Sequence, residues 1–165
     1  MIAFTDVQYG SDFATSACVI ASSWSAPEPV DQWAIRVSPI AEYEPGAFYK
    51  RELPCLLAAL EKAPRLECIV VDGYVWLDSS FTKGLGAHLF DALSGQVPVV
   101  GIAKTAYQGS PMATALRRGL SVKPLYVTSI GLEPDVAIAR VRELHGAWRI
   151  PTLLKAVDAL ARGRA

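Results

Sequence analysis

The chain has 165 residues, 52% of them hydrophobic, and its 16 basic and 16 acidic side chains cancel to a formal net charge of zero. This length suits a single domain, residues 1–165, with a substantial core, and the composition excludes a disordered chain. A neutral chain is no histone-like polyelectrolyte, although a local basic strip could still bind nucleic acid. No apolar run approaches the ~20 residues that span a bilayer, and no signal peptide is evident, so we expect a cytoplasmic protein without membrane partners.

The cysteines give no sign of a disulfide or zinc framework. Cys18, Cys55 and Cys68 are odd in number and widely spaced, which matches no zinc or redox spacing. We predict reduced, mostly buried thiols, as in a cytosolic protein.

The first third of the chain predicts three strands, at residues 2–7, 14–22 and 32–38. The third strand alternates, with Trp33, Ile35 and Val37 on one face. Gly, Ser, Asp and Pro residues separate the segments and supply turns. Because the connections are short, we expect an antiparallel meander.

The rest of the chain alternates between helices and strands. Leucines at i, i+3, i+4 and i+7 predict a helix over 53–60, and Pro54 is tolerated in a first turn, which places Glu52 near the helix start. Residues 105–121 are expected to be irregular or briefly helical. The further strands are predicted at 68–72, 97–103 and 123–128, and the further helices at 85–92, 134–144 and 152–162.

A meander followed by helix–strand alternation implies an α/β protein with a mixed sheet covered by helices. The ribonuclease H-like fold has this order of elements, with acids on the first strand, the first helix region and the fourth strand. Asp6, Glu52 and Asp72 fall on these three elements.

These three acids carry the main functional prediction. Asp6 and Asp72 lie in apolar runs, where an isolated buried carboxylate is unfavourable, and clustered carboxylates repel each other unless a cation compensates. A hard divalent metal, Mg²⁺ or Mn²⁺, used to cut phosphodiesters explains them together. Taken alone, Asp6 could be a strand residue satisfied by backbone donors.

Basic side chains offer two further candidates. Lys104 follows an apolar strand, where it could neutralise a phosphate or simply extend to solvent at the sheet edge. Lys104, Arg117, Arg118 and Lys123 could together form a basic strip for nucleic acid, and an ordinary solvated surface is the alternative.

Four segments in the same order resemble the endonuclease V family, which acts on deoxyinosine. They are Tyr43–Glu52, Ile69–Gly73, Gly84–Leu89 and Pro98–Lys104, and weaker similarity extends over nearly the whole chain. The resemblance implies an endonuclease of DNA repair that cuts the second phosphodiester 3′ to inosine, in DNA, RNA or both.

The resemblance also implies roles for individual residues. Asp6, Glu52 and Asp72 would hold Mg²⁺ or Mn²⁺, and Lys104 would neutralise phosphate charge near the scissile bond. Tyr43 matches an aromatic wedge that enters the duplex beside the lesion, and Gly73 begins the loop that approaches the flipped base.

The chain departs from the family in the loop after Gly73. Tyr74, Val75 and Trp76 replace its flexible glycine segment, and Trp76 could stack on a base or plug the base pocket. Asp78 replaces a family histidine and could be a further metal ligand, a general base, or a loop cap with the serines that follow.

Two other departures affect the expected nucleic-acid face. Glu42 and Glu44 flank Tyr43 and add negative charge to the wedge, and Leu132 replaces another family histidine. We therefore expect the metal chemistry to be kept and inosine recognition to be altered. A non-catalytic nucleic-acid-binding or scaffold protein, and a metal nuclease for another substrate, are the alternatives.

Overall fold

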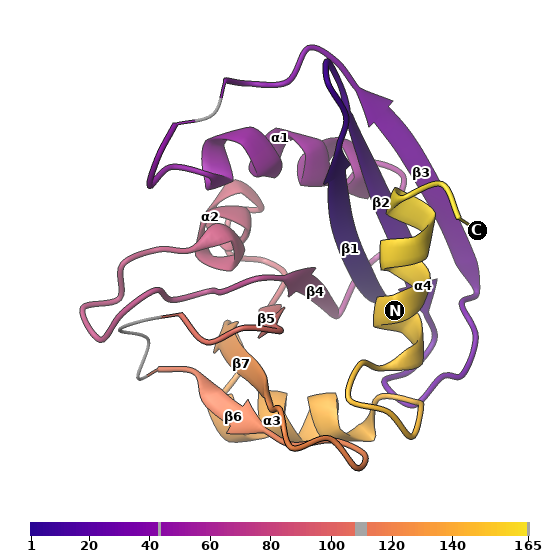
Figure 1. Ribbon diagram of the computed structural model, residues 1–165, viewed down its shortest axis with the longest axis vertical. Coiled ribbons are helices and arrows are strands. Elements are labelled where there is room, and N and C mark those ends of the chain that lie inside the picture. The colour runs from indigo at the N-terminus through magenta and orange to yellow at the C-terminus, as the bar shows by residue number, and fades with distance from the viewer. Residues whose placement is uncertain (43, 108–111, 165) are drawn as a thin grey trace.

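A mixed β-sheet forms the centre of the molecule in the computed structural model, which describes residues 1–42, 44–107 and 112–164 (Figure 1). Within these ranges seven strands pair in the order β3-β2-β1-β4-β5-β7-β6. The strands are β1 (Ile2–Tyr9), β2 (Ala14–Ala21), β3 (Asp31–Val37), β4 (Cys68–Asp72), β5 (Val99–Ala103), β6 (Thr114–Leu116) and β7 (Leu125–Ile130). The helices are α1 (Tyr49–Leu60), α2 (Leu85–Ala92), α3 (Pro134–Glu143) and α4 (Thr152–Ala161).

Strand directions confirm the predicted mixed sheet. β1, β2 and β3 form an antiparallel meander, whereas β1, β4 and β5 run parallel to one another. β7 then pairs antiparallel with both β5 and β6. The carboxyl ends of β1, β4 and β5 consequently lie at the same edge of the sheet, where ligands collect in α/β proteins.

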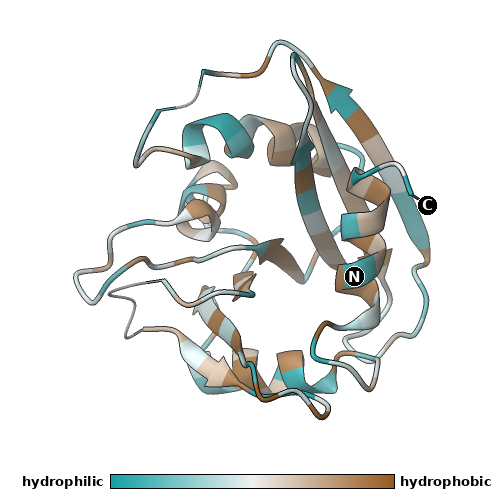
Figure 2. Ribbon diagram, viewed as in Figure 1, coloured by the Kyte–Doolittle hydropathy of each residue, from teal (hydrophilic) through white to brown (hydrophobic). Residues whose placement is uncertain are grey.

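Helices cover both faces of the sheet (Figure 1). α1 and α2 bury one core with residues such as Ala3 and Val71, and α3 and α4 bury the other with residues such as Phe4 and Val70. The alternation of successive side chains between the two cores follows from the pleat of the strands. The edge strand β3 carries both hydrophilic and hydrophobic residues (Figure 2), and Trp33, Ile35 and Val37 are half-buried on one face while the residues between them are exposed.

Several predicted elements have different bounds in the structure, and β5, for example, begins at Val99 and not at residue 97. The segment expected to be irregular contains β6, which is only three residues long and depends on pairing with β7, so no local pattern announces it. β7 begins at Leu125, two residues later than predicted, just after Pro124, which has no N–H to donate to a sheet. α1 begins at Tyr49, so Pro54 lies inside the helix while Glu52 still lies in its first turn.

Two predictions about bulk properties can be compared with the structure. Cys18, Cys55 and Cys68 are free and buried, as predicted. Within the described ranges, every helix is too short or too polar to cross a membrane.

The sheet is tightly packed around Gly101, near the carboxyl ends of β4 and β5. A Cβ atom there would lie 2.5 Å from the Gly73 carbonyl oxygen and 2.9 Å from Thr128 Oγ1. Thr128 Oγ1 already accepts a hydrogen bond from the Val75 N–H at 2.8 Å, so the strands cannot separate without losing it.

We expect Gly101→Ala to destabilise the protein by about 1–3 kcal/mol, because overpacking forces the backbone to move. Thermal unfolding checks this, at roughly 2–4 °C per kcal/mol for a domain of this size. Gly10→Ala is the matched control, since the three atoms nearest to its Cβ all belong to the Phe13 ring, a side chain and not backbone. Equal melting temperatures for Gly101→Ala and wild type would contradict the expectation.

Candidate active site

Two aspartates lie side by side because of the register between β1 and β4. Thr5 pairs with Val71 in this parallel ladder, so the next residues along the two strands are Asp6 and Asp72. Both continue the alternation of Phe4 and Val70, which places them on the face covered by α4. Residues 66 apart in the sequence are thereby brought to one point by strand pairing.

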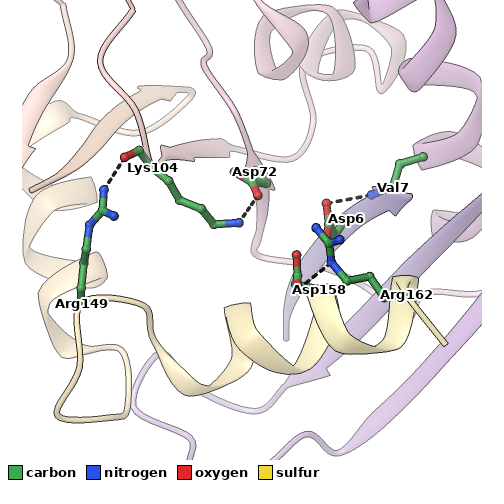
Figure 3. Close-up of polar contacts among 7 residues, drawn as sticks. All are labelled: Asp6, Val7, Asp72, Lys104, Arg149, Asp158 and Arg162. Carbon is green, nitrogen blue, oxygen red and sulfur yellow. Dashed lines mark hydrogen bonds and ion pairs between the residues drawn. The ribbon is translucent and has the colours of Figure 1, made fainter. Parts of the chain in front are cut away.

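Lys104 reaches this point from the neighbouring strand. Asp72 pairs with Ile102 of β5, and Lys104 lies two residues further on the same face. Its Nζ is 2.5 Å from Asp72 Oδ2 (Figure 3). The Arg149 guanidinium donates hydrogen bonds to the carbonyl oxygens of Lys104 and Pro124, so the backbone that carries Lys104 is braced.

Glu52 completes the group from the first turn of α1, where its side chain is buried. Burial, followed by the negative charges of Asp6 and Asp72, raises the pKa of Glu52 to about 8. Burial and then Asp72 raise the pKa of Asp6 to about 6, although the Val7 N–H donates to Asp6 Oδ1 at 2.9 Å and opposes the rise. The three predicted acids are therefore close enough to perturb one another.

Asp158 is a fourth acid that the sequence did not reveal. It lies on α4, where it accepts a hydrogen bond from Arg162 Nε at 3.0 Å (Figure 3). Its negative charge adds to the rise in the pKa of Asp6 and of Lys104. In the sequence, Asp158 and Arg162 are four apart and resemble an ordinary surface ion pair, so no local signal separates them from a solvated helix face.

The donor set suits a hard divalent cation, although no cage is preformed. In the described part of the chain, no group of three or more His, Cys, Asp or Glu side chains is arranged to hold a metal ion. Burial is the main cause of the raised pKa values of Asp6 and Glu52, and the neighbouring acids add to it; a bound cation would favour the charged form of both groups. Mg²⁺ requires only one or two carboxylates, with water and substrate phosphate completing its ligands. The residues present fit such an ion.

A cavity of about 350 Å³ adjoins the acids. Glu52, Asp72 and Gly73 line it on the side of the acids, and Gly73 has a φ of +151°, a conformation that favours glycine. The remaining wall is mainly aromatic and aliphatic, from Gly46, Phe48, Tyr49, Tyr74, Leu77, Lys83, Gly84, Leu85 and Tyr107. Its size and mixed lining suit a flat organic group such as a nucleobase.

Tyr74 connects this cavity to the segment after Lys104. Its hydroxyl donates to the Thr105 carbonyl oxygen at 2.8 Å and accepts from the Tyr107 N–H at 3.0 Å. Tyr74, which replaces part of the family's flexible glycine segment, is therefore held in place by two hydrogen bonds.

The other predicted substrate-binding residues have different outcomes. Trp76 lies away from the cavity beside the acids: its Nε1 donates to the Ser129 carbonyl oxygen at 3.0 Å, and its ring packs edge-on against Phe81. Asp78 Oδ1 accepts from the N–H groups of Ser80 and Thr82, which is the loop-cap alternative. Tyr43 lies outside the described residues.

One residue of the predicted basic strip, Arg118, does not lie on the surface. Arg118 is buried, and its guanidinium donates to the carbonyl oxygens of Leu144, Gly146, Trp148 and Arg149, so its predicted place on the surface is wrong. Sequence composition could not distinguish an arginine that braces loops from one that faces solvent.

The strand order and the acids on β1, α1 and β4 define a ribonuclease H-like protein, the class predicted from the order of elements. Comparison with known proteins narrows this class. The family model described as Endonuclease V matches residues 1–125. The chain belongs to the endonuclease V family.

Individual relatives agree with this assignment. Endonuclease V of Rhodospirillum centenum is 35% identical over a match of 144 residues that covers 72% of this chain and 57% of that protein. The crystal structure of endonuclease V from Streptomyces avermitilis is 27% identical with a TM-score of 0.84, over 98% of this chain and 79% of that one. The Ciona intestinalis enzyme, solved with a 23mer DNA containing an inosine followed by a ribo-adenosine, is 18% identical with a TM-score of 0.81, over 98% and 83% of the two chains. The chain thus spans little more than half of the curated relative.

The raised carboxyl pKa values predict how stability depends on pH in the absence of divalent metal. In the folded protein, Asp6 and Glu52 hold protons up to about pH 6 and 8, whereas their ordinary pKa values are 3.8 and 4.5. The native state therefore binds more protons than the unfolded state in this window, so stability falls as the pH rises from about 4 to 8.

We expect the melting temperature in EDTA to fall by roughly 10–20 °C between pH 5 and pH 8, because Glu52 contributes about three pKa units and Asp6 about one, at ~1.4 kcal/mol per unit and about 2–4 °C per kcal/mol. Glu52→Gln, which has no carboxylate to ionise, should lose at least half of this fall. The exposed Glu28 provides the control, and Glu28→Gln should behave as wild type. If the melting temperature of Glu52→Gln depends on pH as strongly as that of wild type, the raised pKa is wrongly assigned to Glu52.

Proposed function

We propose that this protein is a divalent-metal-dependent endonuclease that hydrolyses phosphodiester bonds in nucleic acid. The observation that carries the proposal is the convergence of Asp6, Glu52 and Asp72, with raised pKa values for the first two, beside an ammonium group. Membership of the endonuclease V family supports it.

Each side chain has a distinct part in this proposal. Asp6 and Asp72, with Glu52 beside them, would hold Mg²⁺ or Mn²⁺, which supplies a polarised phosphate and a more acidic attacking water. Lys104 stands next to Asp72 and offers positive charge to the scissile phosphate. The expected products carry 5′-phosphate and 3′-hydroxyl ends.

The cavity beside the acids suggests that the target base is modified and turned out of the stack. A base extruded from a helix needs a pocket that provides stacking surfaces and polar groups at its edge. The aromatic lining and the Gly73 backbone meet these requirements. The family's preference makes deoxyinosine or inosine the first substrate to test. Tyr74, held by its hydrogen bond to Thr105, is the residue through which the choice of base would differ from that of the family.

One observation favours a second candidate, a non-catalytic nucleic-acid-binding descendant. The Lys104 ammonium pairs with Asp72, and the described residues contain no ready group of three metal ligands. If Lys104 neutralises the negative charge of the acids, the site no longer requires a bound metal ion. Metal binding and cleavage therefore need separate measurements.

For cleavage, we expect wild type with Mn²⁺ to cut deoxyinosine-containing DNA or inosine-containing RNA faster than unmodified controls. Asp72→Asn should lower the rate at least ~100-fold, since it removes both a candidate metal ligand and the partner of Lys104. Glu28→Gln again serves as the matched control. Intact inosine oligonucleotides would end the inosine claim, and cleavage of unmodified strands at the same rate would assign another substrate.

For metal binding, we expect saturating Mn²⁺ to raise the wild-type melting temperature at pH 7.5 by roughly 5–10 °C. An ion at 100 times its dissociation constant adds about 2.7 kcal/mol, and each kcal/mol is worth about 2–4 °C here. Asp72→Asn should lose most of this increase. No stabilisation by Mn²⁺ in wild type would favour the non-catalytic candidate.

A further inference from the structure

Two adjoining surface hollows extend from Lys104 away from the acids. The first, about 370 Å³, is lined by Lys104, Thr105, Ala106, Lys123, Pro124, Tyr126 and Arg149. The second, about 420 Å³, is lined by Leu120, Ser121, Trp148, Arg149, Ile150 and Lys155. Because Arg149 lines both, they form one path that begins at the candidate active site.

The charge along this path is of one sign. Lys104, Lys123, Arg149 and Lys155 line the two hollows, and among the described residues no aspartate or glutamate lines either. The whole chain is neutral, so this is a local concentration of positive charge. A polyanion is the ligand that such a path attracts.

Exposed apolar side chains stand at the far end of the path. The Trp148 side chain is 66% exposed and Leu120 is 98% exposed. Lys155 Nζ lies 5.9 Å from the centroid of the Trp148 ring, at the outer limit of a cation–π contact. Trp148 thus offers an indole surface next to cationic groups.

The backbone beneath Trp148 is firmly held. The buried Arg118 guanidinium donates to the Trp148 carbonyl oxygen at 2.9 Å and also bonds the carbonyl oxygens of neighbouring residues in the same loop. At Gly119, with φ +58°, a Cβ would lie 2.2 Å from the Ala147 carbonyl oxygen, so the two loops touch through backbone. An exposed ring on a rigid loop loses little entropy when a flat group stacks on it.

We propose that this path, hereafter the Trp148 path, binds an unpaired segment of the nucleic-acid strand that flanks the cleaved bond. A base stacks on Trp148, and Lys123 and Lys155 face the strand's phosphates. Stacking on aromatic side chains beside a cationic groove is how proteins hold single strands without reading their sequence. The inference rests on the proposed action on nucleic acid and adds a binding site for single-stranded substrate.

A protein partner fits the same surface less well. Protein–protein interfaces are depleted in lysine, whereas three lysines line this path. The path is also continuous with Lys104, which contacts the candidate active site. Exposed Leu120 would then contact the sugar and base edges of the strand.

The test is binding of fluorescent 20-nucleotide single strands, with and without one deoxyinosine, measured by anisotropy in EDTA so that no cleavage occurs. We expect Trp148→Ala to weaken binding about ten-fold, within the range for the loss of one stacked base. Trp148→Phe, which keeps a ring, should bind within about two-fold of wild type. Circular dichroism melting verifies that each variant is folded.

The salt dependence tests the phosphate contacts independently. For a single strand, log K falls with log salt at about 0.7 per phosphate neutralised, so the double variant K123E/K155E should reduce the slope by about 1.4. K62E/R65E, a matched charge reversal of exposed residues just beyond α1, should leave the slope unchanged. Unchanged affinity in Trp148→Ala, or an unchanged slope in K123E/K155E, overturns the Trp148 path.

Two further outcomes are decisive. The Trp148→Ala loss should be confined to single strands, so an equal loss with a blunt duplex of the same sequence contradicts the unpaired base. Dissociation of a dimer by Trp148→Ala, with strand binding intact, would assign the surface to a second copy of the chain and also overturn the proposal.

This experiment separates the inference from the proposed function. If wild type cleaves with Mn²⁺ but the Trp148 and lysine variants bind as wild type, the Trp148 path falls and the nuclease stands. If no substrate is cleaved but these variants lose binding as expected, the path stands and the metal-dependent nuclease falls.

Discussion

The rest of the site depends on one constraint: Asp6, Glu52 and Asp72 lie close together where burial already disfavours the charged form of Asp6 and Glu52. The parallel pairing of β1 with β4 fixes two of these carboxylates next to each other, and the first turn of α1 adds the third. Because the sheet cannot open to separate them, the charges are relieved only by protons, by Lys104 or by an added cation. The same register that builds the fold therefore creates the demand for positive charge at its edge.

Two arginines, Arg118 and Arg149, hold the loops beside Lys104 in place through hydrogen bonds to the backbone. Arg118 and Arg149 donate to backbone carbonyl oxygens that would otherwise lack partners in irregular loops. The buried guanidinium of Arg118 is tolerated because it donates to several carbonyl oxygens. The loops between β6 and β7 and between α3 and α4 are thus set in place, and Lys123 and Trp148 are presented on a rigid base.

How far the sequence predicted this arrangement differs from residue to residue. Asp6, Asp72 and Lys104 could be predicted because each lies in or directly after an apolar strand, and Glu52 because it lies at the start of a leucine-rich segment. Asp158 was missed because its partner four residues later makes it an ordinary helical ion pair, and only tertiary packing of α4 on β1 gives it a role. Arg118 and β6 likewise depend on neighbours distant in the chain.

Asp72 and Gly73 are consecutive residues that both line the cavity, and the Asp72 carboxylate is also part of the acid cluster. Consecutive Cα atoms lie about 3.8 Å apart, so a single peptide unit holds the acid cluster and the cavity next to each other. Loop residues such as Tyr74 shape the wall of the cavity, but they do not set its distance from the acids. The backbone at the end of β4 thus fixes the position of the cavity relative to the acids.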